Sequence, residues 1–99
     1  MDLVINWDKQ GKHIKGHRNY IEGRSILTAD PELLLKRYAG KGRKIIVDNE
    51  WPNKERFSHT ETIGIWKTKN GEVAKPTKNG IFHYSKRESV HIVPADPND

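Results

Sequence analysis

The chain contains no cysteine among its 99 residues. This absence excludes disulfides, thiolate metal sites and cysteine nucleophiles together. No apolar run approaches the roughly 18 residues that a membrane-spanning helix needs, and the first residues do not form a signal-peptide pattern. We therefore expect no membrane segment in these residues, and we expect any secretion signal to lie in a longer parent protein.

Hydrophobic residues are also scarce, because they make up 33% of the chain while charged residues make up 31%. A chain of this length buries about 60% of the surface that its unfolded form exposes, which is enough for one modest core. Residues 1–99 are therefore predicted to form a single domain with a thin core. The length leaves no room for a separate cofactor-binding domain, and we expect no cofactor.

The charge is unbalanced, since 18 Lys and Arg residues against 13 Asp and Glu residues give a formal net charge of +5. The excess has two interpretations. It can be the positive surface of an ordinary small domain, or it can be a binding face for a polyanion such as RNA or DNA. Composition alone leaves both open.

The clearest predicted helix starts at Asp30. This residue is a good N-cap, Pro31 suits the first helical position, and Gly40 is a natural end. Residues 8–22 have no regular period, so we expect an ordered loop with a helical turn there.

Short strands and polar loops are predicted for most of the remaining chain. The Asn70-Gly71 pair is a strong hairpin signal, and Pro76 is expected to end the strand that follows it. The fold class is therefore α+β, with helical segments first and a small, mostly antiparallel sheet after them. The individual predictions are strands at 44–48, 60–67 and 72–75, a strand or docked segment at 2–7, a loop at 49–58 and a frayed end at 95–99.

The C-terminal third predicts a hairpin with two distinct faces. Residue types alternate along it, which places four apolar side chains on the expected core face: Phe82, Tyr84, Val90 and Ile92. A three-residue loop at 86–88 keeps this alternation in register, whereas a four-residue loop would mix the two faces. The shorter loop predicts three cross-strand pairs: Ser85 with Ser89, Tyr84 with Val90 and His83 with His91.

The other face of this hairpin carries groups for acid–base chemistry. Cleavage of RNA by transphosphorylation needs a base for the 2′-hydroxyl, an acid for the leaving 5′-oxygen, and cations or donors around the phosphate. It needs no metal, because the nucleophile is part of the substrate. His83 and His91 would supply the acid and the base, and nearby hydroxyls and cations would hold the phosphate: Ser85, Thr77, Lys78 and Lys86. The alternative is that these histidines are ordinary residues of a solvated surface.

The N-terminal loop adds His13 and His17, whose four-residue spacing can place two metal ligands on one helical face. Gly16 lies between them and no third ligand follows, so we predict no metal site. Lys12 and Lys15 favour a phosphate-facing basic loop instead. His13 would join the catalytic patch only if the fold brings it there.

Arg24 is a further candidate for phosphate binding, together with Ser25, because a guanidinium is planar and can bind two oxygens at once. The alternative is that Arg24 forms an ion pair with Glu22 or Asp30.

Aromatic residues are candidates for stacking on nucleobases. The chain is poor in apolar residues, so we expect at least two of its three tryptophans to support the core instead. The four aromatic candidates are Trp7, Tyr20, Trp51 and Trp66.

Several of these segments resemble a known family, the polymorphic toxin type 50 domain. Its opening is similar to residues 12–20, KHIKGHRNY, and 23–27, GRSIL. Its close is similar to residues 76–77, PT, 80–86, GIFHYSK, and 90–94, VHIVP. The resemblance runs from about Gln10 to Pro97 and so covers nearly the whole chain.

The resemblance implies a C-terminal piece of a larger secreted bacterial toxin, such as a contact-dependent inhibition protein, or of a phage-associated protein. It implies a ribonuclease of the superfamily that groups barnase, EndoU, colicin tRNases and RelE. The implied fold has one or two N-terminal helices packed on a curved antiparallel sheet of about four strands. A cognate immunity protein, expected to be acidic, would cover the active face. Carried over residue by residue, the resemblance implicates His13, Arg24, Ser25, Thr77, His83, Ser85 and His91.

Taken together, the residues and the resemblance predict a metal-independent endoribonuclease toxin that cleaves cellular RNA, with tRNA among the candidates, in the cytoplasm of a target cell. His13 or His91 would act as base and His83 as acid. Arg24, Lys86, Thr77 and Ser85 would hold the phosphate, and the remaining substrate contacts would come from Lys12, Lys15, Ser25 and Lys78. Two alternatives are a non-catalytic RNA- or DNA-binding module on the same basic face and, ranked last, a metal-dependent DNase.

Overall fold

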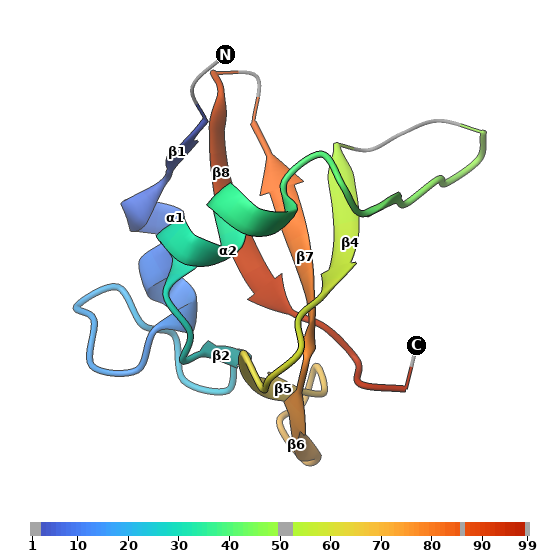
Figure 1. Cartoon of the computed structure of the whole chain (residues 1–99). Coiled ribbons are helices and arrows are strands. Elements are labelled where there is room, and N and C mark those ends of the chain that lie inside the picture. The colour runs from blue at the N-terminus through green and yellow to red at the C-terminus, as the bar shows by residue number, and fades with distance from the viewer. Residues whose placement is uncertain (1–2, 50–52, 86, 99) are drawn as a thin grey trace.

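The fold combines two β-sheets with short helical segments, as Figure 1 shows for the computed structural model, which describes residues 3–49, 53–85 and 87–98. The larger sheet has the strand order β1-β8-β7-β4-β3, and the smaller has the order β2-β5-β6. All pairs are antiparallel except β1 with β8. The elements are β1 (Val4–Ile5), α1 (Trp7–Gln10), η1 (Gly11–His13, a 3₁₀ turn), β2 (Ile26–Leu27), α2 (Pro31–Tyr38), β3 (Arg43–Lys44), β4 (Lys54–Ser58), β5 (Gly64–Lys67), β6 (Ala74–Thr77), β7 (Asn79–Tyr84) and β8 (Ser89–Pro94).

The α+β class is confirmed, and helix α2 forms where it was predicted. The Asp30 side chain accepts a hydrogen bond from the Glu32 N–H at 3.0 Å, which satisfies one of the donors at the helix start. Gly40 follows the helix with a φ of +81°, a left-handed conformation that glycine adopts at little cost. The second, three-stranded sheet was not predicted.

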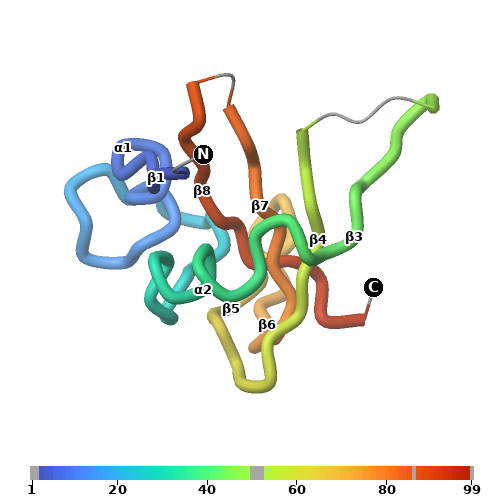
Figure 2. Tube along the Cα trace, turned by 45° about the horizontal axis from the view of Figure 1, so that its top comes forward, coloured from blue at the N-terminus to red at the C-terminus, as the bar shows by residue number. Residues whose placement is uncertain are grey.

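The core lies between α2 and one face of the large sheet. Leu34 and Leu35 of α2 join Phe57, Phe82 and other buried side chains in one cluster. The Phe57 and Phe82 rings stack with centroids 4.4 Å apart. Burying each such side chain contributes on the order of 1.5–3 kcal/mol. Figure 2 shows α2 lying beside β7 and β8, with residues 45–49 extending away from the sheets.

The prediction of a loop at 49–58 is wrong, because Lys54–Ser58 form β4, which lies between β3 and β7. The apolar alternation that marks a strand is missing here, yet Glu55, Arg56 and Phe57 are all buried. Glu55 is only 4% exposed. Its carboxylate tolerates this burial because it accepts hydrogen bonds from the N–H groups of Gly40 and Gly42. Tertiary partners that are invisible in the sequence therefore decide this strand.

Two further predictions near the C-terminus are also wrong. Pro76 does not end a strand but lies inside β6, where it pairs with Ile65. β6 is an edge strand, so a residue without an N–H is tolerated there. Residues 95–98 do not fray, since Ala95 is buried and donates its N–H to the Asn79 carbonyl at 2.9 Å.

The predicted strand at 44–48 is shorter than expected, because β3 comprises only Arg43 and Lys44. Ile46 and Val47 lie beyond it and are 57% and 54% exposed. Trp7 is 46% exposed and Trp66 is half-buried outside the core cluster, so the expectation that two tryptophans support the core is wrong for these two. Trp51 lies outside the described residues.

Candidate active site

The site is built on the β7–β8 hairpin, where His83 lies directly opposite His91. Their imidazole rings stack with centroids 4.7 Å apart and an angle of 22° between the ring planes. The Ser85 N–H donates to the Ser89 carbonyl at 2.8 Å, which closes the three-residue loop. The predicted register, with its three cross-strand pairs, is confirmed.

His13 joins this pair from a distant part of the chain. Its ring stacks on that of His91 with centroids 6.2 Å apart and an angle of 12°. His91 therefore stacks with both other histidines, and three nearly parallel imidazoles form a row. We call His13, His83 and His91 the histidine row.

Gln10 explains why His13 lies there. This side chain is fully buried, and its amide forms two hydrogen bonds with the backbone of Ile92, one residue after His91. Its Nε2 donates to the Ile92 carbonyl at 2.9 Å, and its Oε1 accepts from the Ile92 N–H at 2.7 Å. The amide thus extends the β8 edge as a strand would, and it fastens the α1–η1 segment beside His91. Sequence analysis missed this residue, because a polar residue in a polar loop gives no sign of burial.

The tautomer of His13 follows from its partner. Its Nδ1 lies 2.9 Å from the Ser25 carbonyl oxygen, and a carbonyl can only accept a hydrogen bond. Nδ1 therefore carries the proton, and Nε2 has the lone pair of the neutral ring. Among the described residues no buried side-chain nitrogen or oxygen lacks a hydrogen-bond partner. Nε2 of His13 has no hydrogen-bond partner among these residues, so it cannot be one of the buried atoms. It therefore keeps contact with solvent, although the residue as a whole is only 5% exposed.

Each histidine of the row has a pKa below that of free histidine, so the neutral form is favoured. Burial is the main cause, because it disfavours the charged imidazolium. It lowers the pKa of His83 to about 4, with the charges of Lys54, His13 and Lys9 adding to the effect. It lowers the pKa of His91 to about 3, with added repulsion from His83 and His13 on either side and from Lys9 and Lys12.

His13 differs in one respect. Burial lowers its pKa, but the hydrogen bond to the Ser25 carbonyl opposes this shift, and the charges of Arg24 and Lys12 then add to the lowering. Arg24 and Lys12, both predicted to contact the substrate, are exposed, and their effect on the pKa of His13 places their charges near the row.

A pocket of about 210 Å³ opens beside His83 and His91, which line it, whereas His13 of the row does not. Its size suits one phosphodiester group with part of a ribose rather than a duplex. Two of its residues, Asn6 and Lys9, come from the segment around α1 and were not predicted. Ser85, which was predicted, also lines it. The full lining is Asn6, Lys9, His83, Tyr84, Ser85, Ser89, Val90 and His91.

A comparison with protein families places this geometry in context. The family described as bacterial toxin 50 matches residues 5–94, which is most of the chain and includes the whole histidine row. The chain belongs to this bacterial toxin family. No curated protein matches it significantly. In the described part of the toxin domain, none of the helices has the length and apolar character that a membrane span requires.

Some predicted site residues of the toxin domain lie away from the row. Thr77 is buried, donates its hydroxyl proton to the Ala95 carbonyl at 2.7 Å and accepts the Asn79 N–H at 3.1 Å. Lys78 precedes β7, so six residues of strand separate it from the hairpin turn, and its carbonyl accepts the His59 N–H.

Ser25 contributes to the row through its backbone carbonyl only. Its hydroxyl accepts the Lys67 N–H at 2.9 Å, which ties the loop before β2 to β5. Lys15 is exposed in the N-terminal loop. Lys86 lies outside the described residues.

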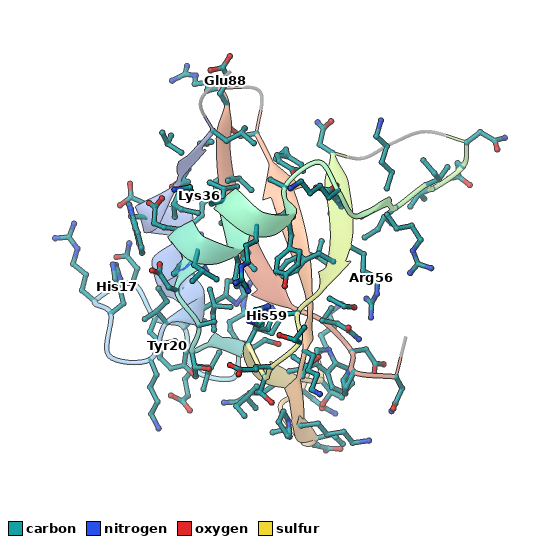
Figure 3. All side chains as sticks on the ribbon, viewed as in Figure 1. His17, Tyr20, Lys36, Arg56, His59 and Glu88 are labelled. Carbon is teal, nitrogen blue, oxygen red and sulfur yellow. The ribbon has the colours of Figure 1, made fainter. Side chains whose placement is uncertain are left out.

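The two remaining histidines of the toxin domain serve local structure. His17, on the N-terminal loop at the edge of the molecule in Figure 3, accepts the Asn19 N–H on its Nδ1 at 3.0 Å. His59, near the centre of the same view, hydrogen-bonds to the Tyr38 hydroxyl at 2.5 Å. Within residues 3–49, 53–85 and 87–98, no group of three or more His, Cys, Asp or Glu side chains is arranged to hold a metal ion.

Proposed function

We propose that this toxin domain is a metal-independent endoribonuclease that cleaves RNA by histidine acid–base transphosphorylation. The observation that carries the proposal is the histidine row: three imidazoles of lowered pKa stacked beside a small pocket that Lys9 lines. Perturbed titratable groups that gather at a pocket are typical of catalytic sites. The family match supports a toxin but does not specify its chemistry.

His13 is the better candidate for the base, because its tautomer leaves Nε2 ready to accept a proton. In the proposed reaction the 2′-hydroxyl gives its proton to this nitrogen while its oxygen bonds to phosphorus. The bond from phosphorus to the 5′-oxygen breaks, and His83 gives that oxygen a proton. The products are a 2′,3′-cyclic phosphate and a 5′-hydroxyl, and exchange with water then restores both histidines.

The lowered pKa values fit a site that is empty before substrate arrives. With all three imidazoles neutral near pH 7, the base is ready but the acid is not. The negative charge of a bound phosphodiester favours imidazolium and raises the pKa of the nearest histidine. His91, which stacks with both other imidazoles, has its pKa lowered to about 3, so it is protonated less readily than His83, whose pKa is lowered to about 4. We therefore assign the acid role to His83.

Cations close to the row would hold the phosphate. Lys9 lines the pocket itself, and Arg24 and Lys12 lie near enough to shift the pKa of His13. The contributions of Lys15, Lys78 and Lys86 to a longer RNA path stay predictions. Thr77 is better explained as a support for the turn at Ala95 and Asn79 than as a phosphate ligand.

The proposal extends to delivery and to a partner. Residues 1–99 would be the C-terminal domain of a larger protein that carries them into the cytoplasm of a target cell. The producing cell would need an immunity protein that blocks the pocket. An acidic surface would suit that protein, because the toxin domain has a formal net charge of +5.

The test is inducible expression in bacteria of the wild type, His83→Ala and His13→Ala, with total RNA run on a denaturing gel. His17→Asn is the matched control, since asparagine keeps an acceptor for the Asn19 N–H outside the row. We expect the wild type and the control to stop growth and fragment RNA, and the other two to do neither. Intact RNA in all four strains would overturn the proposal and favour the non-catalytic binding module.

A further inference from the structure

Two serine hydroxyls close the β7–β8 turn beside the histidine row. The Oγ atoms of Ser85 and Ser89 lie 2.6 Å apart, so they share a short hydrogen bond. Both side chains are half-buried and both line the 210 Å³ pocket. The other partners of the two hydroxyls decide which one donates.

The Ser85 hydroxyl is an acceptor for the backbone of the turn. Its Oγ accepts the Arg87 N–H at 3.2 Å and the Ser89 N–H at 3.3 Å. A hydroxyl has one proton to donate and two lone pairs with which to accept. The two backbone N–H groups occupy both lone pairs of Ser85. The short contact between the hydroxyls must therefore use the Ser85 proton, and Ser89 accepts it.

The Ser89 proton is then left to point elsewhere. Within the described residues no side chain or carbonyl accepts it, whereas the pocket in front of it is where a phosphate would bind. Ser89 also lies two residues before His91 on the same face of β8. Because Ser89 accepts a hydrogen bond from a hydroxyl that backbone N–H groups polarise, its own O–H becomes a stronger donor.

We propose that Ser89, rather than Ser85, is the hydroxyl that contacts the substrate, and that it donates to a non-bridging oxygen of the scissile phosphate. This inference rests on the proposed ribonuclease function. Negative charge grows on the non-bridging oxygens as the 2′-oxygen attacks, so a donor fixed at that position stabilises the transition state more than the bound substrate. Ser85 is a positioning residue that aims the Ser89 proton.

The experiment compares kcat and KM of purified Ser89→Ala, Ser89→Thr, Ser85→Ala and the wild type on an RNA oligonucleotide that spans one wild-type cut. Ser58→Ala is the matched control, because Ser58 is exposed on β4, outside the pocket, and its hydroxyl donates to the Asn79 side chain. We expect Ser89→Ala to lower kcat by about 10²–10³-fold with little change in KM. Ser89→Thr, which keeps the hydroxyl, should restore most of that rate.

Ser85→Ala should behave differently. It leaves the Arg87 and Ser89 N–H groups without their acceptor, so we expect its Tm to fall by about 4–8 °C. Its kcat should fall less than that of Ser89→Ala, whose Tm should stay near that of the wild type. Equal kcat for Ser89→Ala and the wild type, or a larger kcat loss in Ser85→Ala at unchanged Tm, would overturn the assignment.

A second readout separates contact with phosphate from loss of structure. Sulfur accepts hydrogen bonds weakly. In oligonucleotides with sulfur replacing one or the other non-bridging oxygen, one diastereomer should slow the wild type strongly and slow Ser89→Ala no further. Equal thio effects in both enzymes would contradict the contact. If the wild type cuts RNA and His83→Ala does not while Ser89→Ala remains fully active, only the role of Ser89 falls. If the wild type cuts no RNA, both proposals fall.

Discussion

His83 and His91 face each other across β7 and β8, with stacked imidazoles whose centroids are 4.7 Å apart. Protonation of one ring therefore opposes protonation of the other, and burial opposes both. A pair of this kind gives up protons readily and regains them when an anion binds beside it. The pH dependence of the protein follows from this relationship.

The activity of the free enzyme should decline as pH rises. The proposed acid, His83, has its pKa lowered to about 4 before substrate binds, so its protonated fraction falls about tenfold per pH unit well above that value. We expect kcat/KM to decrease between pH 6.5 and pH 8, because the base His13, whose pKa is lowered from 6.5, is already neutral over that range. The kcat profile, which reports the complex, should be displaced to higher pH because bound phosphate raises the pKa of the acid. A kcat/KM that is constant between pH 6.5 and pH 8 would contradict this assignment.

Stability should change with pH in the opposite sense. A histidine whose pKa is lowered in the folded state binds fewer protons there than in the unfolded chain, so stability rises with pH. The contribution of His83 and His91 is complete above about pH 6.5 and is lost as pH falls from there toward about 4 and 3. Because each histidine can differ by at most one bound proton between the two states, its contribution to the slope stays below about 1.4 kcal/mol per pH unit.

Urea denaturation at pH 7.5 and pH 5 measures this loss. The His91→Gln variant, which cannot titrate, should lose less stability between the two pH values than the wild type. Equal losses in wild type and variant would show that the row does not govern acid stability.

The fold could be predicted where local patterns decide it. The hairpin register followed from strict alternation through a polar turn, since a slip of one residue would have exposed Phe82 and Ile92. Helix α2 followed from the Asp30-Pro31 start. β4 could not be predicted, because Glu55 and Arg56 are buried through hydrogen bonds to residues far away in sequence.

The site, like the fold, could be predicted only where local patterns decide it. His83 and His91 meet because neighbouring strands force them together. His13, Lys9 and Lys54 reach them only through tertiary contacts: Gln10 fixes α1 to β8, and Lys54 pairs with His83 across β4 and β7. Whether these residues perform the proposed roles stays a prediction.

Gln10 offers a test of how His13 is held. In Gln10→Leu the Ile92 N–H and carbonyl lose their partners inside the protein, and each unsatisfied buried group costs about 1–3 kcal/mol. We expect the urea midpoint to fall and the ring of His13 to lose its contact with His91. NMR titration of His13 should then show a pKa closer to 6.5, while Glu61→Gln, an exposed control, should change neither quantity. An unaltered His13 titration would mean that Gln10 does not position it.

Glu55 tests whether the hydrogen bonds to its buried carboxylate stabilise the fold. Its carboxylate accepts the Tyr84 hydroxyl at 2.5 Å as well as two backbone N–H groups. Burial and this hydrogen bond raise the pKa of Tyr84. In Glu55→Gln one acceptor oxygen becomes an NH₂ donor facing other donors. We expect a loss of about 1–3 kcal/mol in unfolding free energy. Denaturation with an unchanged midpoint would show that these bonds are not needed.

The central claim is tested most directly by the ends of the cut RNA. Purified toxin domain is incubated with an RNA oligonucleotide in the presence of EDTA, and the products are identified by mass spectrometry. The account predicts fragments that end in a 2′,3′-cyclic phosphate, with a 5′-hydroxyl on the other side of each cut, and none from His83→Ala. Cleavage that stops with EDTA, products with a 5′-phosphate, or no cleavage at all would contradict it.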